Sequence, residues 1–214
     1  MPIETIQLDL KSVDVPDDIS RLIQEADQGM DDYYDAGENK GNPNIVPCDP
    51  TLFYQALAYI TEKDIPIGRV FCEWGSGFGY CGCLAAKLGY ESYGIEWDEK
   101  LVEYSEEFAA KRGIEVTYLQ TSYFPPGYSC YEGAGARELV RPDDSDYRSS
   151  SNLFFPHYPG MEQDTGEIDV FFVYPWPKEH ELMQDLFEDI SSEGALLIAY
   201  YGEGEICVYR KTLD

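Results

Sequence analysis

The segment CEWGSGFGYCGC, residues 72–83, constrains the fold more than any other stretch of the chain. Glycines stand at alternate positions, Gly75, Gly77 and Gly79, and an acid, Glu73, precedes them. An apolar run comes directly before these glycines and a helical pattern directly after. Glycines between a strand and a helix let the backbone come close to a ligand. The segment therefore predicts a ligand-binding turn in an α/β fold.

Strand and helix patterns alternate on both sides of this turn. Alternation at these lengths indicates βαβ units and a parallel sheet, and the end of the chain, ALLIAYYGEGEICVYRK, indicates a hairpin. We predict a three-layer, Rossmann-like α/β fold with a mostly parallel central sheet, an antiparallel C-terminal hairpin and N-terminal helices. The apolar runs expected as parallel strands are 69–73, 92–97, 114–120 and 168–177.

One domain is expected to span residues 1–214, because this length is typical of a single core. Residues 1–48 are predicted to form an N-terminal cap and arm. Residues 123–166 interrupt the alternation and are rich in Pro, Gly, Ser and aromatic residues. A long irregular segment of this kind is often functional, so we interpret it as an insertion or lid, with a purely structural covering loop as the alternative.

The chain carries a formal net charge of −26 at pH 7. Such a field repels a phosphate backbone and attracts amines and basic protein segments, so nucleic acid is an unlikely partner and a cationic substrate fits. No apolar run is long enough to span a membrane, and the N-terminus lacks the pattern of a secretory signal. We expect an acidic cytoplasmic protein without a membrane partner.

Six cysteines and two histidines are present. Without a secretory signal, the cysteines are expected as reduced thiols that pack like small apolar residues. The pair Cys81 and Cys83 could bind a metal, but a tetrahedral site needs about four ligands and His157 and His180 are distant in sequence. We predict no metal site.

The spacing of the glycines separates two kinds of ligand. A nicotinamide or flavin fingerprint, G-x-G-x-x-G, counted from Gly75 requires glycine at position 80, where Tyr80 stands. Glu96 ends the next predicted strand, where a carboxylate can accept hydrogen bonds from ribose hydroxyls. A nucleoside ligand is therefore expected, and a NAD-dependent oxidoreductase stays as an alternative.

Over roughly residues 49–210 the chain resembles the class I S-adenosylmethionine-dependent methyltransferases. The resemblance rests on VFCEWGSGFG, YGIEWD, VTYLQTS and DVFFVYPWP. It implies S-adenosylmethionine as cofactor, with the glycine loop around its methionine portion, the acid after the second of these strands on its ribose, and the next residues near its adenine. The implied cofactor-binding residues are Glu73, Gly75, Ser76, Gly77, Gly79, Glu96, Trp97, Gln120, Thr121 and Ser122.

The segment VYPWP, residues 173–177, is expected where ligands bind in open α/β sheets. Tyr174 and Trp176 can offer ring faces to a sulfonium or a cationic amine, and His157 is the candidate general base. Methyl transfer needs mainly proximity and alignment. The predicted activity is methyl transfer to an unidentified small-molecule or protein acceptor, with a non-catalytic S-adenosylmethionine-binding protein as a further alternative.

Overall fold

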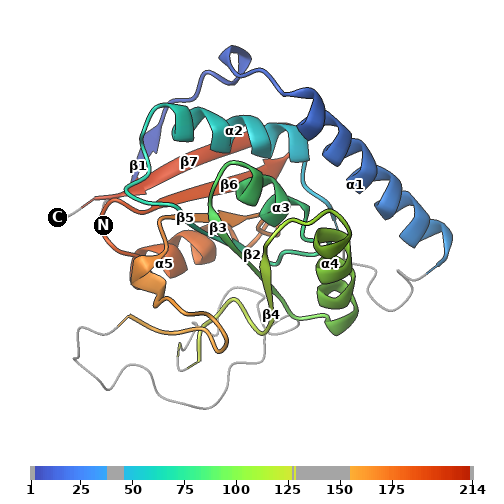
Figure 1. Ribbon diagram of the computed structural model, residues 1–214. Coiled ribbons are helices and arrows are strands. Elements are labelled where there is room, and N and C mark those ends of the chain that lie inside the picture. The colour runs from blue at the N-terminus through green and yellow to red at the C-terminus, as the bar shows by residue number, and fades with distance from the viewer. Residues whose placement is uncertain (1–2, 38–45, 127, 129–154, 213–214) are drawn as a thin grey trace.

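The computed structural model describes residues 3–37, 46–126, 128 and 155–212, which form one seven-stranded sheet flanked by helices (Figure 1). The strands are β1 (Ile3–Ile6), β2 (Val70–Trp74), β3 (Glu91–Glu96), β4 (Thr117–Gln120), β5 (Val170–Val173), β6 (Leu196–Gly202) and β7 (Glu205–Lys211). The helices are α1 (Asp17–Asp35), α2 (Pro50–Glu62), α3 (Tyr80–Lys87), α4 (Glu99–Lys111) and α5 (His180–Ile190), with short 3-10 turns η1 (Leu10–Ser12) and η5 (Thr165–Glu167).

The strand order is β1-β7-β6-β5-β2-β3-β4. Strands β2 to β6 run parallel, whereas β7 is antiparallel to β6 and β1 is antiparallel to β7. The predicted mostly parallel sheet with antiparallel C-terminal strands is confirmed. The chain leaves β2 toward β3 and β4 and returns on the other side as β5, so the order reverses between β2 and β5. Ligands bind at such a reversal, outside the carboxyl ends of the strands.

Two helix starts form as their sequences predict. Asp49 precedes Pro50 and accepts hydrogen bonds from the backbone N–H groups of Thr51 and Leu52, at 2.9 and 3.0 Å. Asp98 accepts one from the N–H of Lys100 at 2.9 Å. Such side-chain caps satisfy N–H groups that have no partner within the helix. They fix where α2 and α4 begin.

Alternate residues of the central strands bury opposite faces of the sheet. Phe71 and Phe172 face a core that α1, α2, α3 and α4 complete, whereas Trp74 and Phe171 face α5 and the segment 155–168. Each of these four rings is at most 2% exposed. The two layers enclose the sheet along β2 and β5, and therefore hold rigid the strands whose ends form the site.

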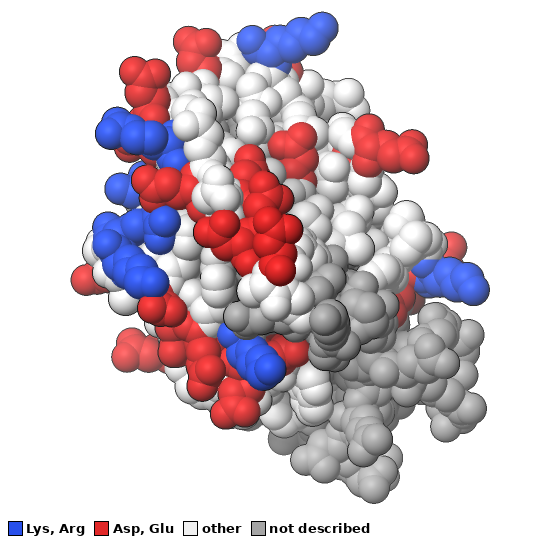
Figure 2. Space-filling model, turned by 90° about the vertical axis from the view of Figure 1, so that its right-hand side faces the viewer, with Lys and Arg blue, Asp and Glu red and all other residues white. Residues whose placement is uncertain are grey.

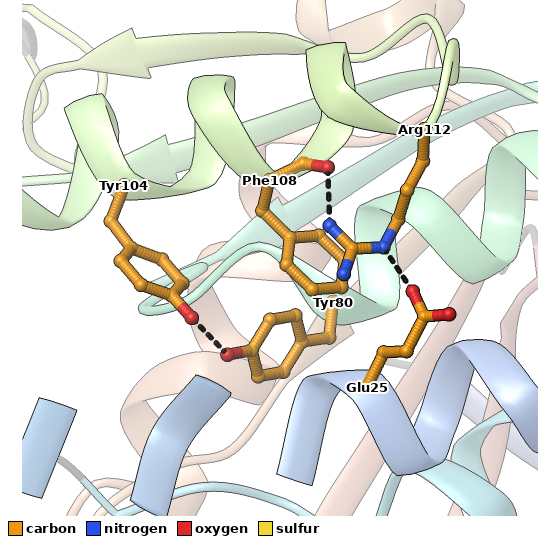
Figure 3. A network of polar contacts seen from close by, with 5 residues as sticks. All are labelled: Glu25, Tyr80, Tyr104, Phe108 and Arg112. Atoms are coloured by element: carbon orange, nitrogen blue, oxygen red, sulfur yellow. Dashed lines mark hydrogen bonds and ion pairs between the residues drawn. The ribbon is translucent and has the colours of Figure 1, made fainter. Parts of the chain in front are cut away.

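Helix α1 is fixed to α3 and α4 by a polar and aromatic network (Figure 3). Arg112 forms an ion pair with Glu25 of α1 at 2.7 Å, donates to the carbonyl of Phe108 at 2.9 Å and lies 3.5 Å from the centroid of the Phe108 ring. The hydroxyls of Tyr80 and Tyr104 lie 3.1 Å apart. The N-terminal helix is thus anchored to the helix that follows the glycine loop.

The described ends of the predicted insertion pack against the second face of the sheet. Tyr158 is fully buried, and its hydroxyl donates to the carbonyl of Tyr123 at 2.5 Å. Residue 127 and residues 129–154 lie outside the described residues, so the interpretation of 123–166 as a lid stays a prediction. None of the described helices is long and apolar enough to cross a membrane.

Candidate functional site

The glycine loop joins β2 to α3 in a tight turn. Gly75, Gly77 and Gly79 have φ values of 72°, 51° and 73°, in the left-handed region that favours glycine. The N–H groups of Gly75 and Ser76 donate to the carbonyl of Ile95 at 2.9 and 2.8 Å, which holds the turn to the end of β3. A Cβ atom at Gly75 or Gly77 would meet no described heavy atom within 4 Å. These two positions therefore leave open space beside the backbone.

Gly79 is constrained from below by Tyr118 of β4. A Cβ atom at Gly79 would lie 2.6 Å from the Tyr118 ring, and one at Gly94 would also lie 2.6 Å from it. The Tyr118 hydroxyl donates to the carbonyl of Gly79 at 2.7 Å. The buried ring supports the loop, so this glycine is needed for close packing as well as for its positive φ.

Glu73 is a buried carboxyl at the floor of the site, only 5% exposed. It accepts hydrogen bonds from the N–H of Gly82, at 3.2 Å, and from the thiol of Cys81. Burial raises the pKa of Glu73 to about 8, although both hydrogen bonds favour the ionised form. A cation bound beside Glu73 would favour ionisation and bind more tightly for the same reason.

Glu96 lies at the carboxyl end of β3 and is tied to backbone N–H groups. Its Oε1 accepts from Trp97 at 2.7 Å and from Asp98 at 2.9 Å, and its Oε2 accepts from Gly77 at 2.9 Å. A carboxylate oxygen has about two acceptor positions, so Oε2 keeps one for a ligand hydroxyl. The side chain is oriented beside the glycine loop before any ligand binds.

A pocket of about 60 Å³ opens beside the loop, between the ends of β2 and β5 and the helix α1. The Oγ atom of Ser76, which lines it, is buried without a hydrogen-bond partner among the described residues. The lining includes the predicted residues Glu73, Gly75, Ser76, Gly77, Gly79 and Tyr174. It also includes residues that the sequence did not reveal as neighbours of the loop: Met30, Val46, Pro47, Cys48, Pro50, Phe78, Tyr80, Cys81 and Phe172.

Carboxyl groups gather near the pocket. Burial raises the pKa of Asp27, and the charges of Asp31 and Asp49 raise it further. Asp27 and Asp31 are one helical turn apart on α1, on either side of Met30 in sequence, and Asp49 stands between the lining residues Cys48 and Pro50. The electrostatic field at this side of the pocket is therefore negative.

The other predicted cofactor residues lie around Glu96. The N–H of Thr121 donates to the carbonyl of Glu96 at 3.0 Å, and Ser122 Oγ accepts from the N–H of Phe124 at 3.1 Å. Trp97 follows Glu96 directly and is 61% exposed. Gln120 is the last residue of β4, paired with Glu96 across the strands. These residues share the carboxyl edge of the sheet with the loop but do not line the pocket.

The three predicted catalytic residues are not brought together. Tyr174 lines the pocket, its ring 4.8 Å from that of Tyr200, and Trp176 is 38% exposed beyond the end of β5. His157 lies apart, 3.4 Å from Asp164 in an ion pair. Gln163, the neighbour of Asp164 in sequence, donates to Glu91 at the amino end of β3. The pocket and His157 are therefore associated with opposite ends of the sheet.

His180 begins α5, and its ring lies 4.5 Å from that of Tyr201, away from the pocket lining. Within the described ranges, no group of three or more His, Cys, Asp or Glu residues is placed to hold a metal ion.

Comparison with known proteins relates this architecture to methyltransferases. No family model matches the chain. The chain is 27% identical over 123 residues to a lysine N-methyltransferase of Caenorhabditis elegans that is named for ATP synthase, covering 54% of this chain and 65% of that protein. It thus spans just under two thirds of the relative's length. The resemblance to S-adenosylmethionine-dependent methyltransferases is confirmed as a similarity in sequence to an enzyme of this class.

Solved structures support the fold. A Thermus thermophilus 16S rRNA methyltransferase, in complex with S-adenosylmethionine and guanosine, superposes with a TM-score of 0.50 at 11% identity, covering 80% of this chain and 45% of that one. An RNA methyltransferase of Salinibacter ruber, in complex with S-adenosyl-L-homocysteine, gives a TM-score of 0.49 at 18% identity, covering 78% and 93%. The Rossmann-like methyltransferase fold predicted from the sequence is confirmed.

Proposed function

We propose that this chain binds S-adenosylmethionine at the glycine loop and transfers its methyl group to an amine, with a lysine side chain of a basic protein segment as the favoured acceptor. The observation that carries the proposal is the pocket itself. It combines an open glycine turn, a buried acid and an unpartnered hydroxyl at the point where the strand order reverses.

The residues present fit the methionine portion of this cofactor. Glu73 offers a carboxyl to a ligand ammonium group, and Ser76 Oγ offers a buried hydrogen-bonding group that no described residue satisfies. Glu96 Oε2 keeps acceptor capacity for a ribose hydroxyl. The remaining expected contacts, Trp97, Gln120, Thr121 and Ser122, are proposed for the adenine end.

The choice of acceptor rests on charge and on the aromatic residue at the pocket. Figure 2 shows the face that carries α1 and α4, where Asp and Glu side chains gather in a broad patch. The exposed acids of α1 are Asp17, Asp18, Glu25, Asp27, Asp31, Asp32 and Asp35. This surface favours a cationic partner over RNA, even though some proteins of similar fold act on RNA. The relative from Caenorhabditis elegans, a lysine N-methyltransferase by name, agrees with this choice.

When bound, S-adenosylmethionine supplies a reactive methyl on a sulfonium. The role of this chain is to hold the acceptor close, exclude water and orient the attacking atom. Burial raises the pKa of Tyr174, so its hydroxyl keeps its proton at neutral pH. Tyr174 therefore acts through its ring face and as a donor, and Trp176 contributes a second aromatic surface nearby. His157 is a weaker candidate for the base, because its contacts lie toward the other end of the sheet.

A methyl-transfer assay tests the proposal. With methyl-labelled S-adenosylmethionine, we expect label on a lysine-rich peptide, little on the same peptide with acetylated lysines, and none on RNA of equal length. Tyr174→Ala should lower the rate, while Phe155→Ala, an exposed aromatic of the second face, should not. Label on RNA alone would contradict the choice of acceptor. Cofactor binding without transfer to any acceptor would favour a non-catalytic binding protein.

A paired set of serine variants tests cofactor binding at the loop. Ser76→Ala removes an unpartnered hydroxyl, so it should leave the free energy of unfolding unchanged or raise it while weakening S-adenosylmethionine binding by about tenfold. Ser105→Ala is the matched control, because its buried hydroxyl contacts the carbonyls of Gly77 and Leu101. That variant should lose stability by about 1 kcal/mol. Unchanged affinity in Ser76→Ala would remove Ser76 from the proposed site.

A further inference from the structure

Two cysteines from different elements meet at the edge of the pocket. The Sγ atoms of Cys48 and Cys81 lie 3.3 Å apart, although 33 positions separate them in sequence. Cys48 stands one residue before the cap of α2, and Cys81 lies in the first turn of α3. Both line the pocket beside Glu73. Helix α2 and helix α3 pack against each other, so both backbones are held in place around the two sulfurs.

We propose that Cys48 and Cys81 form a redox-active dithiol, whose oxidation to a disulfide narrows the pocket and weakens cofactor binding. The disulfide site stands on the sulfur contact alone, whereas its effect on cofactor binding rests on the function proposed above. A disulfide joins sulfur atoms about 2 Å apart, so the two atoms need to approach by roughly 1 Å. That movement draws the segment before α2 toward the glycine loop.

The pair differs in accessibility in the way that stepwise oxidation requires. Cys48 is half-buried, whereas Cys81 is 3% exposed. Cys48 is therefore the thiol that an oxidant reaches first, through the pocket. Burial raises the pKa of Cys81 well above its usual value, which makes it slow to react with an external oxidant. Its sulfur is nevertheless in contact with that of Cys48, so it can complete an internal disulfide.

The reaction balances with a small disulfide such as oxidised glutathione. The Cys48 thiolate attacks one glutathione sulfur, its proton passing to solvent, and the first glutathione leaves as a thiolate that takes up a proton. Cys81 then attacks the Cys48 sulfur and releases the second glutathione. The thiol of Cys81 donates a hydrogen bond to the Glu73 carboxylate, which is placed to receive its proton and pass it to that leaving thiolate. Two protein thiols are oxidised and one glutathione disulfide is reduced.

Oxidation changes the site in two ways. It removes the thiol donor from Glu73, while the hydrogen bond from the N–H of Gly82 to that carboxyl stays. It also fixes two lining residues across a pocket of only about 60 Å³. Loss of one hydrogen bond to a charged group corresponds to roughly a tenfold loss of affinity. We expect the oxidised protein to bind S-adenosylmethionine about tenfold more weakly than the reduced protein.

The full chain is titrated with glutathione disulfide and followed by intact mass, free-thiol titration and non-reducing peptide mapping. The expected product has lost two thiols, carries no glutathione, contains a Cys48–Cys81 link and is restored by dithiothreitol. Cys207→Ser should form the same link, because Cys207 lies on β7. Cys81→Ser should retain glutathione on Cys48. Persistent mixed disulfide in the unmodified protein, or no loss of thiols, overturns the proposal.

Binding measurements separate this inference from the proposed function. If both hold, S-adenosylhomocysteine should slow disulfide formation by covering the pocket, and oxidation should weaken its binding. A disulfide that forms without any change in affinity overturns the regulatory effect. If the reduced protein binds neither S-adenosylmethionine nor S-adenosylhomocysteine, the proposed function fails, while the peptide map still decides whether the dithiol is redox-active.

Discussion

Replacement of Gly79 by alanine tests the packing that supports the glycine loop. A Cβ atom there would lie 2.6 Å from the Tyr118 ring, and the residue has a φ of +73°. The left-handed conformation costs an L-residue about 1–2 kcal/mol, and forcing an extra carbon into a close-packed contact costs about 1–3 kcal/mol. We expect Gly79→Ala to lower the free energy of unfolding by roughly 2–5 kcal/mol.

Gly89→Ala is the matched control. Gly89 has a φ of +86°, but a Cβ atom there would meet no described heavy atom within 4 Å. This variant should show the backbone cost alone, about 1–2 kcal/mol. Urea unfolding of both variants, each with an unchanged m-value, measures the difference. The contact with Tyr118 accounts for whatever Gly79→Ala loses beyond Gly89→Ala.

A double-mutant cycle separates the contact from the backbone term. Tyr118→Val removes the ring atoms that a new Cβ would meet. In that background, Gly79→Ala should cost no more than Gly89→Ala does in the unmodified chain. The reasoning is refuted if Gly79→Ala costs as little as Gly89→Ala in the unmodified chain, or if its cost is the same with and without the Tyr118 ring.

Three further perturbations follow from buried and capping groups. Burial raises the pKa of Glu73 from 4.5 to about 8, so the native state binds more protons than the unfolded state between these values. Unfolding free energy should therefore fall by up to about 4 kcal/mol from pH 5 to 8 in the unmodified protein and much less in Glu73→Gln, and equal pH profiles would contradict the shift. Arg112→Ala should destabilise by about 1–2 kcal/mol, more than Glu25→Gln, because it also loses the hydrogen bond and ring contact at Phe108; equal losses in urea unfolding would reduce the network to its ion pair. Asp49→Ala should lower the melting temperature through loss of about 1 kcal/mol of capping energy, and an unchanged melting temperature would show that the cap is not needed.

Much of the fold could be predicted because its signals are local. The cap at Asp49, the turn before Tyr80 and the apolar strands all depend on neighbours in the sequence. The parallel sheet follows from alternating strand and helix patterns, because parallel strands need a crossover between them. The place of Glu96 beside the glycine loop follows in the same way, since parallel strands present their carboxyl ends at one edge.

The rest of the site depends on contacts between distant segments. Nothing local in the sequence of α1 indicates that Met30 lines the pocket; the position of the helix is set by its network with Arg112 and Tyr104. The contact of Cys48 with Cys81 likewise needs the packing of α2 on α3. The prediction of His157 as a base depends on its residue type within an aromatic segment, a signal that carries no information about which end of the sheet it approaches.

Calorimetric titration of the reduced chain with S-adenosylmethionine, S-adenosylhomocysteine and NAD tests the central claim most directly. We predict one binding site per chain for the first two, competition between them, and no heat of binding with NAD. Binding of NAD without binding of S-adenosylmethionine or S-adenosylhomocysteine would contradict the claim and support the oxidoreductase alternative instead.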